Sequence, residues 1–143
     1  MTTRLPDWPQ RLNRYIVEAE ARYAQTGLVW GEFDCATFVC DWASIATGAD
    51  PMADYRRLYH SREEAAKALR ALGDGTLEGA LQRVFGEPVP AASGQRGDIA
   101  FRREDKTCGI FIAQGARMRA VFLGESGLMG LPALHFDLAF RVG

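Results

Sequence analysis

The apolar residues of this chain change their spacing near its middle, from a helical to a strand-like pattern. Through residue 85 they recur at intervals of three and four, which places them on one face of a helix. After residue 98 they gather in short runs separated by loops that contain glycine. Helices followed by strands predict an α+β domain, in which N-terminal helices pack on a C-terminal antiparallel β-sheet.

Residues that favour helix starts and turns set the expected boundaries. Each expected helix follows a residue whose side-chain oxygen can cap it, and these residues are Asp7, Asp34, Asp50, Ser61 and Thr76. The expected strands are 99–101, 108–113, 118–123, 127–131 and 136–142, and residues 88–90 are expected to form a loop. The last strand alternates apolar and polar residues, so it is predicted to be half-buried, with His135 on its polar face.

The composition is that of an ordinary globular protein with a single domain, residues 1–143. The chain has 48% hydrophobic residues, and its 17 Lys and Arg against 18 Asp and Glu give a formal charge of −1. This balance excludes a strongly basic surface for nucleic acid. The sequence has neither an apolar run long enough to cross a membrane nor a signal-peptide core, so we expect synthesis in the cytoplasm and no membrane insertion.

Cys35 directly follows Asp34, a good helix-capping residue, and begins an apolar run with helical spacing. As the first residue of a helix, Cys35 would lie against free backbone N–H groups and the positive end of the helix dipole. Both lower the pKa of a thiol. This position suits a nucleophile. The same residues are compatible with a buried structural cysteine at a strand-to-helix turn, so both interpretations stay open.

The three cysteines form neither a disulfide framework nor a zinc-binding pattern, and we expect no metal and no cofactor. Cys40 is expected in the core, since five residues along one helix turn it away from Cys35. Cys108 is expected to be a buried strand residue, with a redox-sensitive disulfide to Cys35 or a partial metal site as alternatives. Trp30 is a second candidate neighbour of Cys35, in the wall of a pocket. Asp98 fits a turn residue whose carboxylate accepts backbone N–H groups.

Three motifs of the chain resemble those of the NlpC/p60-like group of papain-fold cell-wall peptidases. In that group a D-C-x-x-[FL] motif opens a helix, a G-D pair opens a strand, and a later strand begins H-x-G-I. The corresponding segments here are DCATF at 34–38, RGDIAF at 96–101 and TCGIFI at 107–112. The resemblance implies a papain-like, NlpC-type fold, with Cys35 at the nucleophile position and Asp34 as its cap.

Over nearly its whole length the chain resembles, more closely, a family of small phage and prophage tail-region proteins within this group. The features that carry this resemblance are LPDWP at 5–9, WG at 30–31, TG at 47–48, DP at 50–51 and AFRVG at 139–143. The resemblance implies a component of a phage tail that is made in the bacterial cytoplasm and then carried in the virion.

The main departure from the peptidase pattern is at Thr107, which stands where the resemblance expects the catalytic histidine. Threonine does not titrate near neutral pH, so it cannot act as the general base. The chain has two histidines, and both His60 and His135 are expected on the surface, away from Cys35. Loss of the base removes a proton transfer that normally contributes roughly 10²–10⁴-fold to the rate.

The preferred interpretation is a tail-tip or hub structural protein that keeps the peptidase fold without its catalytic histidine. Its partners would be other tail proteins and peptidoglycan, contacted through the apolar segment 123–131 or the N-terminal arm 1–8. The alternative is an active cysteine endopeptidase or amidase that cuts peptidoglycan stem peptides, with Cys35 as nucleophile. A thiol-based acyl-binding module is a third interpretation.

Overall fold

The computed structural model of the chain describes residues 3–56, 58–72, 75–113 and 118–143. Within these ranges the helices are α1 (Trp8–Thr26), α2 (Cys35–Thr47), α3 (Arg62–Leu72) and α4 (Leu77–Phe85). The strands are β1 (Val89–Pro90), β2 (Ile99–Arg102), β3 (Thr107–Phe111), β4 (Arg119–Leu123), β5 (Leu128–Pro132) and β6 (Leu138–Phe140). All strand pairs are antiparallel, which confirms the predicted α+β class. None of the helices within the described ranges is long and apolar enough to cross a membrane.

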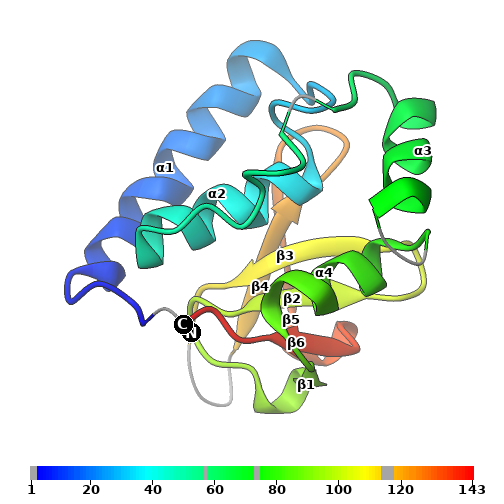
Figure 1. Ribbon diagram of the computed structural model, residues 1–143. Helices are drawn as coiled ribbons and strands as arrows, with labels where there is room; N and C mark the ends of the chain where they lie inside the picture. The colour runs from blue at the N-terminus through cyan, green and yellow to red at the C-terminus, as the bar shows by residue number, and fades with distance from the viewer. Residues whose placement is uncertain (1–2, 57, 73–74, 114–117) are drawn as a thin grey trace.

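The sheet has the strand order β1-β6-β2-β3-β4-β5, so the last strand in sequence, β6, lies between the edge strand β1 and β2. In β6, Ala139 pairs with Val89 on one side and with Ala100 on the other. After β5 the chain crosses back over the sheet through a short 3₁₀ turn, η3 (Ala133–His135). All four helices contribute to a single apolar cluster with one face of the sheet, which gives the two-layer arrangement seen in Figure 1.

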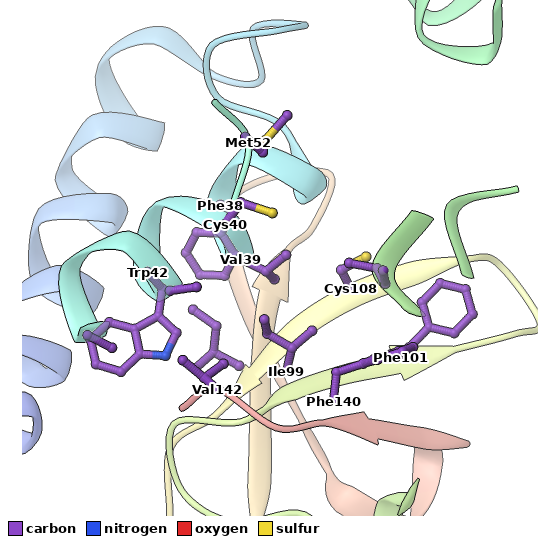
Figure 2. Close-up of a cluster of buried hydrophobic side chains, with 14 of the residues drawn as sticks. Phe38, Val39, Cys40, Trp42, Met52, Ile99, Phe101, Cys108, Phe140 and Val142 are labelled. Atoms are coloured by element: carbon purple, nitrogen blue, oxygen red, sulfur yellow. The ribbon is translucent and has the colours of Figure 1, made fainter. Parts of the chain in front are cut away.

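Helix α2 forms the centre of this cluster. Phe38 and Trp42 are fully buried and pack with Ile99, Ile110 and Phe140 of the sheet, as Figure 2 shows for most of these residues. Because successive strand residues point to opposite faces, every second residue of β2, β3 and β6 meets the helices. Trp42 is therefore a core residue between α2 and the sheet.

The other face of the sheet carries a second, smaller apolar cluster. It contains Ala100, Phe111, Phe122 and Phe136, and it is covered by η3 and by a second 3₁₀ turn, η1 (Ala91–Ser93). The rings of Phe111 and Phe122 each meet that of Phe136 edge to face, which suits the aromatic quadrupole.

The last strand differs from the half-buried strand predicted for 136–142. Ala139 is fully buried, because η1 and η3 cover the face that was expected to be exposed. Phe136 precedes β6 and packs on the opposite face from Phe140. His135 ends η3 and is exposed, so it lies outside the strand.

Two further segments differ from the prediction. Residues 51–56 form turns rather than a helix, because the Asp50 carboxylate accepts the Met52 N–H at 2.9 Å and binds Arg56 at 2.7 Å. Such side-chain bonds to nearby backbone compete with helix formation. Residues 89–90, expected in a loop, form β1, and Pro90 is tolerated there because this strand is at the edge of the sheet.

Where the expected helices form, their caps form too, with the exception of Asp7. Ser61 and Thr76 each accept a hydrogen bond from the backbone N–H three residues on, at 3.1 and 3.0 Å. Asp7 precedes α1 as predicted, but its carboxylate makes no cap bond and instead accepts from Arg11 at 2.8 Å. An ion pair one turn along the helix therefore replaces the cap of α1.

A buried ion pair ties the two ends of the chain together, and Figure 1 shows those ends side by side. Asp98 is 2% exposed, and its carboxylate accepts from Arg4 at 2.7 Å, from the Val142 N–H at 3.2 Å and from the Gln95 N–H at 3.0 Å. The interpretation of Asp98 as a turn residue that accepts backbone N–H groups is confirmed.

The N-terminal arm, expected to be free for partners, is packed against the fold. Arg4 lies over the ring of Trp8, 4.3 Å from its centroid, and the Leu5 N–H donates to a carbonyl of α2 at 2.7 Å. Residues 1–2 of the expected arm lie outside the described residues. The described part of the arm is therefore a structural element rather than an open contact surface.

Candidate functional site

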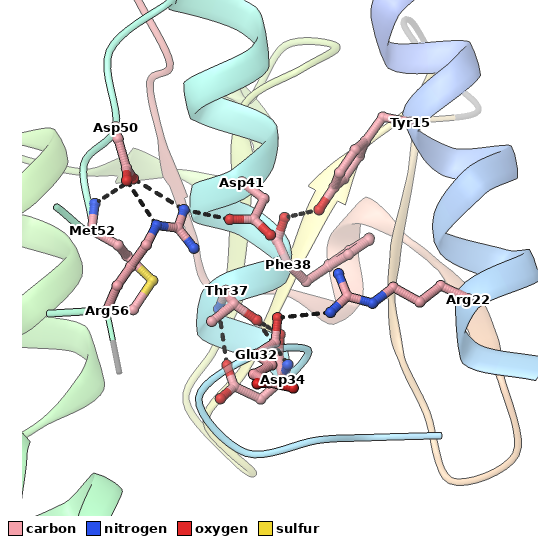
Figure 3. Close-up of polar contacts among 10 residues, drawn as sticks. All are labelled: Tyr15, Arg22, Glu32, Asp34, Thr37, Phe38, Asp41, Asp50, Met52 and Arg56. Carbon is pink, nitrogen blue, oxygen red and sulfur yellow. Dashed lines mark hydrogen bonds and ion pairs between the residues drawn. The ribbon is translucent and has the colours of Figure 1, made fainter. Parts of the chain in front are cut away.

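Asp34 caps α2 through a reciprocal pair of hydrogen bonds, and Cys35 is the first helical residue as predicted. The Asp34 carboxylate accepts the Thr37 N–H at 2.9 Å, and the Asp34 N–H donates to the Thr37 hydroxyl at 2.8 Å. The second carboxylate oxygen accepts the Gly31 N–H at 2.8 Å. Figure 3 shows Asp34 and Thr37 joined at this helix end. Asp34 is therefore tied to Gly31 before Cys35 and to Thr37 after it, and these bonds fix the position of Cys35.

The loop before Cys35 is held against residue 59. Gly31 has φ +84°, and a Cβ at this position would lie 2.1 Å from the Tyr59 carbonyl oxygen, so the contact requires glycine. Burial, together with the negative charge of the nearby Asp34, raises the pKa of Tyr59. The tyrosine therefore stays protonated beside the carboxylate.

The thiol of Cys108 faces Cys35. Cys108 lies on β3 beside Ile110, is fully buried, and belongs to the apolar cluster against which Cys35 packs. The two thiols lie close enough to interact directly. The interaction with Cys108 lowers the pKa of Cys35, and the same interaction, together with burial, raises the pKa of Cys108 well above the ordinary value. Cys35 is therefore the member of the pair that ionises, and Cys108 keeps its proton.

The other influences on the pKa of Cys35 oppose one another. Burial and the charge of Asp34 disfavour the thiolate, whereas the backbone amides at the start of α2 favour it. The net direction is downward, because the interaction with Cys108 is the largest effect. In other low-pKa thiols a neighbouring cation stabilises the thiolate, and here the thiol of Cys108 has that role.

Thr107 does not occupy the place that the sequence assigned to it. It begins β3, one residue before Cys108, and strand residues alternate between faces. Thr107 therefore shares the face of Phe111, which belongs to the cluster on the far side of the sheet. The residue of this strand that meets Cys35 is Cys108, so the position facing the thiol is one residue further along than expected.

Neither histidine joins the two thiols. His60 is exposed, and its Nδ1 atom lies 3.9 Å from the place that a Cβ on Gly31 would take. His135 is exposed in η3, beside the cluster on the far face of the sheet. The groups that act most strongly on the Cys35 thiol are Cys108, Asp34 and backbone amides. The expected surface positions of both histidines are confirmed.

An apolar cavity of about 140 Å³ lies beside Cys35. Trp30, Asp34, Cys35, Ala36 and Cys40 form part of its wall, which confirms the expected wall position of Trp30. The rest of the wall consists of residues from the turn after α2 and from α3 and α4, namely Met52, Tyr55, Tyr59, Ala65, Ala68, Leu69, Leu77, Ala80, Leu81 and Val84. An engineered cavity of about 150 Å³ binds benzene, so this one suits a single small apolar group.

Sequence reasoning missed the contribution of α3 and α4 to this site. The signal available was the set of alanines on these helices, Ala65, Ala68 and Ala80, whose small side chains leave the space open. An alanine in a helix is also the best intrinsic helix former, so its presence alone does not indicate a cavity. Within the described residues there is no group of three side chains suited to hold a metal ion.

The site therefore combines a low-pKa thiol at a capped helix start, a protonated thiol facing it and an apolar cavity beside it. No curated protein matches the chain. Residues 3–142, nearly the whole chain, match a family described as a domain of unknown function (DUF6950), and the chain belongs to that family.

Proposed function

We propose that this protein has a papain-like, NlpC-type fold without the catalytic histidine, and that it serves as a structural subunit at the tip or hub of a phage-type tail. The observation that carries the proposal is the identity of the side chain facing Cys35, which is a second thiol, Cys108. The start of α2 at Cys35 and its packing on an antiparallel sheet support the fold. The tail context, with synthesis in the bacterial cytoplasm and carriage in the virion, rests on the resemblance of the sequence.

A second thiol cannot replace the imidazole of a cysteine peptidase. The base must take the proton of the nucleophile and then return it to the leaving amine. The raised pKa of Cys108 means that this thiol is already protonated at neutral pH, so it cannot accept the proton of Cys35. The Cys35 thiolate can form, but the leaving amine has no proton donor matched to it.

A hydrolysis assay on purified protein tests the loss of activity. We expect no useful turnover of peptidoglycan or of model stem peptides, measured by release of new amino groups. The matched control is Cys35→Ser, whose signal should equal that of the wild-type protein. Turnover that disappears in Cys35→Ser contradicts the proposal.

A gain-of-function experiment tests the geometry more sharply. If only the base has been lost, Cys108→His should create hydrolysis, because position 108 faces Cys35. Thr107→His is the matched control and should remain inactive, since position 107 lies on the other face of the sheet. Activity in Thr107→His but not in Cys108→His would overturn the assignment of the facing position.

The surface around β5 is the proposed contact with neighbouring tail proteins. β5 is an outer strand, and Met129 on it is 48% exposed. Leu134, in the turn that follows, is 87% exposed. An outer strand offers unpaired backbone groups to a partner strand, and exposed apolar side chains add contact area. A stable complex needs on the order of 800 Å² from each partner, so these residues would be the middle of a larger contact.

Assembled particles test this contact. We expect the protein to co-purify with tail-tip proteins, and the substitutions Met129→Lys and Leu134→Lys to abolish its incorporation. Val17→Lys is the control, because Val17 is 67% exposed but lies on α1 rather than on β5 or the turn after it. Cys35→Ala should leave assembly and infection intact. Normal assembly with lost infection in Cys35→Ala would contradict the structural role.

One observation favours the alternative, an active endopeptidase or amidase on peptidoglycan stem peptides. The pKa of Cys35 is lowered and an apolar cavity lies beside it, as a peptide-binding nucleophile requires. The apolar wall suits a small apolar side chain of a peptide better than a glycan, whose hydroxyls need polar partners. The hydrolysis assay with Cys35→Ser decides between the two functions.

A further inference from the structure

Two of the three cysteines of this protein are neighbours in space although 73 residues apart in sequence. Cys35 begins α2 and Cys108 lies on the face of β3 that packs against this helix. The two cysteines belong to one packed apolar cluster, their thiols interact directly, and both are free thiols. The third, Cys40, is buried on a later turn of α2.

We propose that Cys35 and Cys108 form an oxidation site that reacts with hydrogen peroxide and closes to an intramolecular disulfide. In the first step the Cys35 thiolate attacks one peroxide oxygen. An S–O bond forms, the O–O bond breaks, hydroxide leaves, and Cys35 becomes a sulfenic acid. In the second step the Cys108 sulfur attacks the Cys35 sulfur. The S–S bond forms, the S–O bond breaks, and the hydroxide takes the Cys108 proton and leaves as water.

The surroundings of the two sulfurs assign them these different roles. Cys35 is half-buried and lines the cavity, so a small oxidant can reach it. Its lowered pKa supplies the thiolate that the first step needs. Cys108 is fully buried and keeps its proton, so it meets no oxidant of its own. It is in contact with the one sulfur that becomes electrophilic, which makes it the resolving cysteine.

Cys40 provides an internal control for this assignment. Burial raises the pKa of Cys40 to about 12, so it has almost no thiolate at neutral pH. Cys40 lines the same cavity as Cys35, so a small oxidant can reach both sulfurs. A nonspecific oxidation would therefore modify both, whereas the proposed site leaves Cys40 reduced because Cys40 lacks the thiolate.

Peptide mapping of the peroxide-treated protein tests the proposal. The reduced protein is treated with hydrogen peroxide, unfolded in an alkylating agent and digested. We expect one disulfide between Cys35 and Cys108, a single alkylated cysteine at position 40, and full reversal by dithiothreitol. A disulfide that includes Cys40, a link between two chains, or a Cys35 sulfinic acid without a disulfide would each overturn the proposal.

Two variants test the order of the steps. Cys108→Ser should stop at the sulfenic acid of Cys35, which dimedone labels, whereas the wild-type protein should label weakly because the disulfide forms first. Cys40→Ser should behave as the wild-type protein does. Equal dimedone labelling of wild-type protein and Cys108→Ser would show that Cys108 does not resolve the intermediate. The mapping of the wild-type protein decides the matter even where a variant folds poorly.

Discussion

Asp34 and Asp98 are both buried where a loop meets a regular element, yet they are held in different ways. Asp98 is paired with the guanidinium of Arg4 and also accepts backbone N–H groups. Asp34 is held by neutral donors, namely the backbone N–H groups of Gly31 and Thr37. Asp98 is 2% exposed and Asp34 is 1% exposed, so burial alone does not distinguish them.

The difference in partners separates a structural site from a candidate functional one. The charge of Asp98 is balanced within an ion pair that joins segments from both ends of the chain. The negative charge of Asp34 is not balanced by an ion pair of this kind. It acts on the adjacent Cys35, where it raises the pKa and so disfavours the thiolate. Asp34 therefore positions Cys35 and at the same time raises its pKa. The interaction with Cys108 lowers this pKa by more, so the net shift is downward.

Asp98→Ala should have the largest effect on stability. Removal of the carboxylate leaves the half-buried guanidinium of Arg4 without a counter-charge. It also leaves the backbone N–H groups of Gln95 and Val142 without their acceptor. We expect a loss of about 3 kcal/mol in the free energy of unfolding, measured by urea denaturation. Asp7→Ala removes an exposed ion pair with Arg11 and is the control, with a change close to the error of the measurement. Equal losses in the two variants would mean that Asp98 does not hold the ends of the chain.

Asp34→Ala should have a smaller effect on stability, of about 1–2 kcal/mol, because it removes a helix cap rather than an ion pair. Asp34→Asn should lose less than Asp34→Ala, since asparagine keeps an acceptor for the Thr37 N–H but loses the second acceptor that binds the Gly31 N–H. The same urea denaturation measures both variants. If the asparagine variant loses as much as the alanine variant, the charge of Asp34 or its bond to Gly31, rather than the helix cap, stabilises the fold.

Cys108→Ala should raise the pKa of Cys35, because the thiolate loses the interaction that most favours it. The rate of alkylation of Cys35 by iodoacetamide follows the thiolate fraction, so its midpoint should move to higher pH. The site of alkylation is checked by peptide mapping. An unchanged midpoint would show that the helix start alone lowers the pKa of Cys35.

Asp34→Asn should shift the pKa of Cys35 in the opposite direction and by less. The substitution removes the negative charge beside the thiolate while it keeps the cap, so the midpoint of alkylation should move to lower pH. The charge of Asp34 influences the pKa of Cys35 less than the interaction with Cys108 does, so we expect a smaller shift. A shift to higher pH would mean that Asp34 acts on Cys35 only through the helix cap.

The sequence by itself determined the features that depend on neighbouring residues. The start of α2 at Cys35 follows from Asp34 and Thr37, which are three residues apart and satisfy each other's hydrogen bonds. The change of apolar spacing was sufficient to predict the α+β class, because helices and strands each impose their own period on the chain. The role of Asp98 in a turn was predictable for the same local reason.

Only the tertiary structure decided which distant residues meet at the site. The order of the strands places β6 between β1 and β2, and the coverage of both its faces made Ala139 buried where the alternation predicted exposure. The register of β3 against α2 turned Cys108, rather than Thr107, towards Cys35, and a shift of one residue in a strand reverses its faces. The packing of α3 and α4 around small side chains formed the cavity. These outcomes depend on contacts between segments far apart in the chain, and such contacts are not encoded in any local pattern of residues.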